Sequence, residues 1–298
     1  MKSSEKRAFI AMPVILGAAV GVALAGSASG AIVFGAPLFA LCFGLAFLIQ
    51  WMAFVPAFLK KTEKFYDLTG SITYFAVAIF AIVFSPAPDF RAYVLVGLVL
   101  IWAARLGSFL FSRIQEAGED RRFREIKQSF WRFLMTWTIQ GLWVSFSLAA
   151  ALAAITSTSR IEFGPYAITG AILWLLGFAI EVVADQQKRQ FRANRENKGK
   201  YISSGLWSWS RHPNYFGEIV LWSGIAVMAL PVLSGWQYLT LISPVFVYVL
   251  LTKISGIPML EKSADERWGG QEAYEDYKDQ TSILFPLPPS DRSQSVEA

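Results

Sequence analysis

The chain has 298 residues, of which 54% are hydrophobic and only 16% are charged, whereas about a quarter of residues are charged in soluble globular domains. This composition excludes a soluble α/β enzyme and a disordered chain, and the single Cys42 excludes a disulfide scaffold. In a membrane protein, the net charge of +5 indicates first the topology of the loops and an attraction to anionic lipid, and only then an anionic ligand.

Eight apolar stretches are long enough to cross a bilayer core about 30 Å thick, which takes about 20 helical residues. In chain order they run over residues 8–26, 33–59, 68–85, 91–111, 130–156, 163–184, 215–232 and 236–254. No internal repeat and no Ser/Gly-rich linker separates them. We therefore predict an all-α fold, a polytopic transmembrane helical bundle with seven or eight spans.

The Lys and Arg side chains alternate between the loops. With a cytoplasmic N-terminus, the basic clusters fall in the first seven residues and in the loops at 60–64, 113–127 and 188–211, all on the inner face. The opposite turns hold only Arg91 and Arg160. This positive-inside pattern predicts an integral membrane protein whose basic loops face the cytoplasm.

The first span has an alternative interpretation. Lys2, Lys6 and Arg7 precede an apolar run that ends in VALAGSASG, which also fits a cleaved signal peptide. The run is longer than the usual apolar region of a signal peptide, about 7–15 residues, and this favours a retained span. Cleavage would leave seven spans.

Polar side chains are rare within the spans, where a charge costs about 2.5–3.5 kcal/mol on insertion scales. The second, fourth and fifth spans contain Gln50, Arg105 and Gln140. The end of the sixth span carries one helical face of Glu181, Asp185, Arg189 and Arg192, and the seventh opens with Asn214 and Glu218. Each group alone fits a capped helix end with a local ion pair, but together they flank one basic loop.

The segment GLWSWSRHPNYFGE, residues 205–218, contains the only histidine of the chain. Pro213 precedes a helical run, and proline is tolerated in the first turn of a helix. A helix N-terminus beside Arg211 favours phosphate or carboxylate binding at the membrane edge. His212 is either a general acid or a loop histidine that braces the turn through a backbone carbonyl.

The sequence lacks the motifs that bind several other kinds of cofactor and ligand. The chain has no Gly-rich dinucleotide fingerprint after a strand, no P-loop and no Cys/His cluster with metal-ligand spacing. We therefore expect no metal site. The basic residues do not accompany a soluble DNA-binding element, so we expect no nucleic-acid partner.

The run EVVADQQKRQFRANRENKGKYISSGLWSWSRHPNYFGEI resembles the C-terminal region of the steroid 5-alpha-reductase family, and more closely its bacterial branch. The resemblance extends from about Trp174 to Pro286 and includes YEDYKDQTSILFP, while the first 130 residues match mainly in their pattern of spans. It implies a polytopic reductase, in a bacterial inner membrane, that transfers hydride from NADPH to a carbon–carbon double bond of a lipidic enone.

The resemblance also implies a cofactor site that faces the cytoplasm. Asp185 and Arg192 would contact the adenosine side, Asn214 and Glu218 the nicotinamide carboxamide or its ribose, and Arg211 and Lys253 the phosphates. The other residues expected to bind the cofactor are Glu181, Arg189, Lys200, Tyr201, His212 and Tyr215.

The substrate side departs from the family. Steroid reductases carry a Gln-Glu pair in an early span, but FLIQWMAFVP has Gln50 followed by Trp51, and Trp102 lies near the expected Tyr. Asp67 and Tyr74, seven residues apart on one helical face, are the candidate replacements and join Gln50 as expected catalytic residues. Alternatively, Asp67 is a helix N-cap and Tyr74 forms an interior hydroxyl bond.

These expectations divide the chain by role: 1–32 a first span or signal-like segment, 33–160 the substrate-side helices, 161–286 the cofactor-side membrane domain and 287–298 a disordered tail. We expect a monomer with a hydrophobic small-molecule or lipid substrate and membrane lipid as partners. RHPNYFG also fits the isoprenylcysteine carboxyl methyltransferases, which bind S-adenosylmethionine. A third possibility is a non-catalytic lipid-binding protein.

Overall fold

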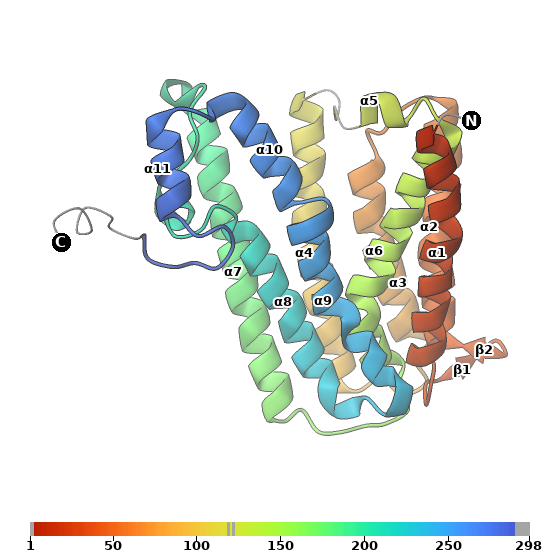
Figure 1. Cartoon of the computed structure of the whole chain (residues 1–298). Coiled ribbons are helices and arrows are strands. Elements are labelled where there is room, and N and C mark those ends of the chain that lie inside the picture. Colours follow the sequence, from red (N-terminus) through yellow and green to blue (C-terminus); the bar gives the residue numbers. More distant parts are fainter. Residues whose placement is uncertain (1–2, 118–119, 121–122, 290–298) are drawn as a thin grey trace. The chain divides into compact units, whose positions relative to one another are not determined.

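A computed structural model describes residues 3–117, 120 and 123–289 (Figure 1). The end of the tail expected to be disordered, from residue 290 on, lies outside the described residues. The chain divides into two compact units, one of Met1–Thr169 with Ile225–Ser243, the other of Gly170–Gly224 with Pro244–Ala298. The division by role predicted from the sequence concerns function and stays a prediction.

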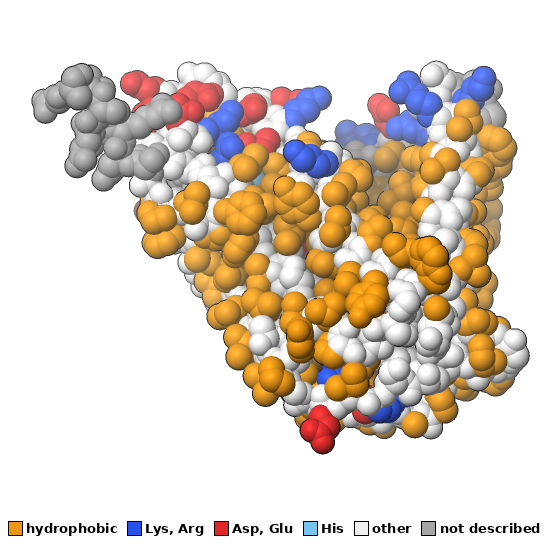
Figure 2. Space-filling model, turned by 60° about the horizontal axis from the view of Figure 1, so that its bottom comes forward, with side chains coloured by type: hydrophobic (Ala, Val, Ile, Leu, Met, Phe, Trp, Pro, Cys, Tyr) orange, Lys and Arg blue, Asp and Glu red, His pale blue; other side chains and the backbone are white. Residues whose placement is uncertain are grey.

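The predicted fold class is confirmed. Within the described residues, eight helical segments are long and apolar enough to cross a membrane: Ser3–Gly26, Leu38–Leu59, Tyr66–Phe84, Phe90–Ser112, Phe130–Thr156, Pro165–Ala193, Pro213–Val232 and Gly235–Trp268. Figure 2 shows hydrophobic side chains over much of the face that it presents. In the structure as a whole, large hydrophobic side chains such as Val14, Leu24 and Val83 are exposed, as expected of helices that contact lipid. The chain is an integral membrane protein.

The first unit is built around one helix, α6 (Phe130–Thr156), which contacts α1 (Ser3–Gly26), α2 (Leu38–Leu59), α3 (Tyr66–Phe84) and α4 (Phe90–Ala117). Its second half is buried on every side and rich in alanine, from Ala149 to Ala154. Small side chains let neighbouring helices approach closely in a membrane. A short helix α5 (Phe123–Ile126) precedes α6.

The predicted second span begins later than expected, because residues 32–37 form a β-hairpin. Strand β1 (Ile32–Val33) pairs antiparallel with β2 (Ala36–Pro37), with Ile32 opposite Pro37 and Val33 opposite Ala36. Phe34 and Gly35 both have positive φ, the conformation that a two-residue hairpin turn requires. Helix α2 therefore starts at Leu38 rather than near residue 33.

The structure explains the two arginines that depart from the loop-charge pattern. Arg91 is buried, and its Nη1 and Nη2 donate to the carbonyls of Ile161 and Glu162 at 3.1 and 2.8 Å. Arg160 donates to the carbonyls of Ala87 and Ser157. Both guanidinium groups thus satisfy carbonyl groups of the loops that follow α3 and α6.

The second unit contains most of α7 (Pro165–Ala193) and α8 (Pro213–Ala229), joined by two 3-10 turns, η1 (Arg195–Asn197) and η2 (Gly205–Ser208). After the 3-10 segments η3 (Leu230–Val232) and η4 (Gly235–Leu241) of the first unit, the chain continues through α9 (Ile242–Val249) and a π-helical turn η5 (Leu250–Ile254). Two short helices follow, α10 (Ile257–Trp268) and α11 (Glu272–Gln280). Gly269 and Gly270, the latter with positive φ, separate them.

Helices α7 and α8 lie side by side (Figure 1), and glycines bring their backbones into direct contact. A Cβ on Gly177 would lie 2.5 Å from the carbonyl oxygen of Gly217, and a Cβ on Gly217 would lie 2.5 Å from that of Gly177. One heptad away, a Cβ on Gly224 would lie 2.5 Å from the carbonyl oxygen of Gly170. This approach fixes how the polar ends of α7 and α8 face each other.

Candidate functional site

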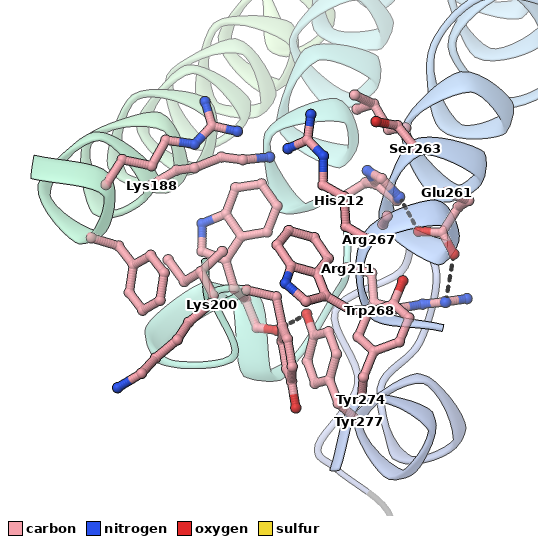
Figure 3. A pocket seen from close by; sticks show the side chains of 17 residues that line it. Lys188, Lys200, Arg211, His212, Glu261, Ser263, Arg267, Trp268, Tyr274 and Tyr277 are labelled. Atoms are coloured by element: carbon pink, nitrogen blue, oxygen red, sulfur yellow. Dashed lines mark hydrogen bonds and ion pairs between the residues drawn. The ribbon is translucent and has the colours of Figure 1, made fainter. Parts of the chain in front are cut away.

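The second unit contains a cavity of about 220 Å³ (Figure 3). Its walls come from the end of α7, the segment that contains η2, and helices α10 and α11. The polar and aromatic side chains that line it are Lys188, Arg192, Lys200, Tyr201, Trp207, Arg211, His212, Glu261, Ser263, Arg267, Trp268, Tyr274 and Tyr277.

The charges at the cavity are unbalanced. Five of these lining side chains are cationic, Lys188, Arg192, Lys200, Arg211 and Arg267, whereas Glu261 is the one carboxylate among the lining residues that the structure describes. Lys188 also lies over the ring of Trp207, with Nζ 4.2 Å from the ring centroid. Such a cationic surplus around a concave site attracts anions.

Glu261 holds two adjacent residues of the RHPNY segment. Its Oε2 accepts a hydrogen bond from Nη1 of Arg211 at 2.6 Å, and its Oε1 lies 2.8 Å from Nε2 of His212 (Figure 3). The main-chain amide of Arg211 donates to the carbonyl of Ser282, which ties the same segment to the chain beyond α11. A carboxylate that bridges two donors orients both side chains.

His212 sits in a restrictive environment. The residue is 4% exposed, its ring stacks on Tyr215 with centroids 5.7 Å apart, and its amide donates to Oγ of Ser210 at 3.1 Å. Burial lowers the pKa of His212 below its ordinary value of 6.5, and Lys188 and Arg211 act in the same direction, while Glu261 opposes them. His212 is therefore neutral at pH 7.

Aromatic side chains form one wall of the cavity, and their polar atoms donate hydrogen bonds to other parts of the chain. Tyr201 donates to the carbonyl of Ala273 at 2.7 Å, Tyr277 to that of Trp207 at 2.7 Å, and Trp268 to that of Gly199 at 2.6 Å. The rings of Tyr201 and Tyr277 stack at 5.4 Å. This aromatic wall, made of Tyr201, Trp268, Tyr274 and Tyr277, joins α11 to the segment before η2.

A second polar group lies where α7 meets α8. Nδ2 of Asn214 donates to Oδ1 of Asp185 at 3.1 Å, and Asp185 is 7% exposed. Glu181 and Glu218 are also buried, and a Cβ on Gly217 would touch the backbone nitrogen of Glu181 at 2.7 Å. The two carboxylate-bearing helix ends that the sequence singles out therefore meet directly.

The cavity brings together five of the predicted cofactor-binding residues: Arg192, Lys200, Tyr201, Arg211 and His212. Tyr215 joins them through its stacking on His212. Glu181, Asp185, Asn214 and Glu218 gather at the α7–α8 contact instead and do not line the cavity. Arg189 and Lys253 are exposed and do not line it either.

The predicted catalytic residues belong to the first unit. Nε2 of Gln50 donates to Oγ1 of Thr73 at 2.8 Å, and Trp51, which stands where the steroid reductases carry Glu, donates to Oγ1 of Thr138 at 3.1 Å. Asp67 is half-buried in the first turn of α3. No side-chain cap bond is found at the start of that helix, whose N-cap is Phe65.

Tyr74 forms an interior hydroxyl bond. Its hydroxyl lies 2.6 Å from Oγ of Ser147. The hydroxyl of Ser147 donates to the carbonyl of Trp143 at 2.7 Å, so Tyr74 is the donor of the pair. Its ring also packs edge-on against Trp102 at 5.0 Å.

Comparison with known proteins identifies the family. The model of a family described as "Protein of unknown function (DUF1295)" matches residues 53–281. The chain belongs to the DUF1295 family. No solved structure matches it.

Named relatives of this DUF1295 protein include two kinds of enzyme. It is 30% identical over 123 residues to "3-oxo-5-alpha-steroid 4-dehydrogenase 1" of Bos taurus, and this match covers 41% of this chain and 42% of that protein. It is 38% identical over 82 residues to "Probable O-methyltransferase ustE" of Ustilaginoidea virens, and this match covers 27% of this chain and 29% of that protein. The predicted resemblance to steroid 5-alpha-reductases is confirmed, although the matches span less than half of each relative.

Sequence reasoning missed several lining residues of the DUF1295 cavity. Glu261 and Trp268, seven residues apart, and Arg267 lie on α10. The seven-residue spacing of Glu261 and Trp268, which places both on one helical face, was the available signal. Tyr274 and Tyr277 lie in YEDYKD, which the resemblance included without giving it a role.

Proposed function

We propose that this DUF1295 protein is a membrane-embedded reductase that uses NADPH to reduce a carbon–carbon double bond of an unsaturated hydrophobic lipid, such as an enone or a steroid-like molecule. One observation carries the proposal, namely a cavity whose described lining residues include five cationic side chains, one carboxylate and an aromatic wall. The reductase-like relatives support the reaction class.

The donor set fits the phosphate groups of NADPH. Arg and Lys are the residues that bind phosphates, and Arg does so through two parallel hydrogen bonds. At about 220 Å³ the cavity is smaller than most sites for small molecules, about 300–1,000 Å³. It would therefore hold the phosphate-bearing part only, and Asp185, Asn214 and Glu218 would hold another part. Bound NADPH supplies the hydride.

Gln50 and Tyr74 are the residues that we propose for the substrate side. Hydride addition to an enone develops negative charge on the carbonyl oxygen, so a hydrogen-bond donor must reach that oxygen. The Gln50 amide and the Tyr74 hydroxyl are buried donors of the first unit. Either could exchange its present acceptor, Thr73 or Ser147, for a substrate carbonyl. We assign Asp67 a supporting role at the start of α3.

The methyltransferase alternative is favoured by the likeness to ustE. S-adenosylmethionine has no phosphate and carries a positive sulfonium, so the cationic cavity favours the dinucleotide. Titrating the purified protein with NADPH and with S-adenosylmethionine separates the two functions. Tight binding of the methyl donor without a response to NADPH would reject the reductase. Steady NADPH consumption with a reduced lipid product would eliminate a non-catalytic lipid-binding role.

Two substitutions test the residue assignment. Asp185→Ala and Glu218→Gln should weaken NADPH binding by about tenfold or more, the equivalent of about 1.4 kcal/mol. The matched control is Gln190→Ala, which changes an exposed residue of the same helix α7. Thermal unfolding in detergent checks that the fold is retained. If both variants bind NADPH as the control does, these residues do not form the cofactor site.

A further inference from the structure

His212 presents one ring nitrogen that the fold leaves unused. Glu261 is a hydrogen-bond acceptor whose other oxygen is held by Arg211, so the ring nitrogen that faces it, Nε2, carries the proton. In the neutral ring, Nδ1 is then a lone-pair acceptor. The tautomer is thus set by Glu261.

Nδ1 has no hydrogen-bond partner among the residues that the structure describes. The side chain is 5% exposed, and His212 is among the residues that line the cavity. Buried polar atoms are nearly always paired, so an exception beside a cavity calls for a partner, which a ligand group can supply. Because Nδ1 can only accept, the missing group is a donor.

The neighbours of His212 narrow the identity of that donor. Arg211 precedes it in the chain and shares Glu261 with it, so the acceptor lies beside a cation suited to phosphate. In a nucleotide, the groups closest to a phosphate are the hydroxyls of the ribose, whereas the amino group of the base lies farther away. A phosphate and a neighbouring sugar hydroxyl together match Arg211 and His212.

We infer that Nδ1 of His212 accepts a hydrogen bond from a ribose hydroxyl of the bound nucleotide, next to the phosphate that Arg211 engages. The inference rests on the proposed function and adds that His212 recognises the ribose of the nucleotide. His212 is then a binding residue held in one tautomer by Glu261, and it is not the proton donor of the reaction.

Two substitutions of similar size separate the two ring nitrogens. In His212→Asn the amide oxygen takes the place of Nδ1, while in His212→Gln the amide nitrogen takes the place of Nε2 and keeps the bond to Glu261. We expect H212Q to weaken NADPH binding by about tenfold, the value of one hydrogen bond. H212N should restore most of that loss. The reverse order would overturn the inference.

Inorganic pyrophosphate provides the matched ligand, because it carries phosphates without a sugar. H212Q should bind pyrophosphate as the wild-type protein does. An equal loss for pyrophosphate and NADPH would mean that His212 acts through Glu261 and Arg211, and would overturn the inference. If the wild-type protein binds AMP but not NADPH, the proposed cofactor fails, and the same comparison of H212Q with H212N on AMP still decides the role of His212.

Discussion

The glycine contact between α7 and α8 makes a quantitative prediction. In Gly177→Ala the new Cβ would lie 2.5 Å from both the carbonyl oxygen of Gly217 and the amide nitrogen of Leu221, whereas ordinary contact begins at 3.4 Å. Both atoms are backbone, so no side chain can turn away. The two helices must separate locally by about 1 Å, and overpacking of this kind costs about 1–3 kcal/mol.

Gly97→Ala in α4 is the matched control, because nothing lies within 4 Å of its new Cβ. Replacing a mid-helix glycine by alanine stabilises a helix by about 0.5–1 kcal/mol, and this gain applies to both variants. We therefore expect G177A to be less stable than G97A by about 1–3 kcal/mol in reversible unfolding in mixed micelles.

The same substitution should also affect the site. The separation of α7 from α8 would lengthen the bond between Asp185 and Asn214, now 3.1 Å, so G177A should weaken NADPH binding while G97A does not. Equal stability of the two alanine variants would refute the direct backbone contact. A destabilised G177A with unchanged NADPH affinity would show that the α7–α8 polar group does not serve the cofactor.

Two further predictions concern a loop and a titration. Arg91→Ala removes two hydrogen bonds from a buried guanidinium to the carbonyls of Ile161 and Glu162, so it should lower the free energy of unfolding by about 2–3 kcal/mol. Glu162→Ala is the control, because it keeps the main-chain carbonyl and should leave the free energy of unfolding unchanged. Burial lowers the pKa of His212, so the unfolded chain gains a proton there as the pH falls below 6.5 while the folded chain resists it. The wild-type protein should therefore lose stability relative to H212Q between pH 7 and pH 5, and parallel stability curves would contradict this assignment.

Hydropathy was sufficient to predict the spans, because a membrane helix needs only length and apolar composition. It could not predict the hairpin at 32–37, since IVFGAP is as apolar as the helix that follows. The close pairing of Gly177 with Gly217 was equally hidden, because it depends on how α7 faces α8.

The site was predictable only where its residues are neighbours in sequence. Arg211 and His212 stood out in one motif, as did Asp185 and Arg192 along one helix. Glu261, which holds both Arg211 and His212, lies 50 residues from Arg211. A single sequence contains no signal for a contact over such a separation. The fold alone supplies it.

The aromatic wall has a consequence for which ligands the cavity admits. Tyr201, Tyr277 and Trp268 each donate to a backbone carbonyl, so moving any of these side chains to another rotamer would break a hydrogen bond. Arg192, Lys200 and Arg267 are instead exposed, on long and flexible side chains. The site therefore combines a fixed aromatic shape with cationic groups on long side chains, and it should tolerate a shift of the phosphates more readily than a group that is bulkier than its walls admit.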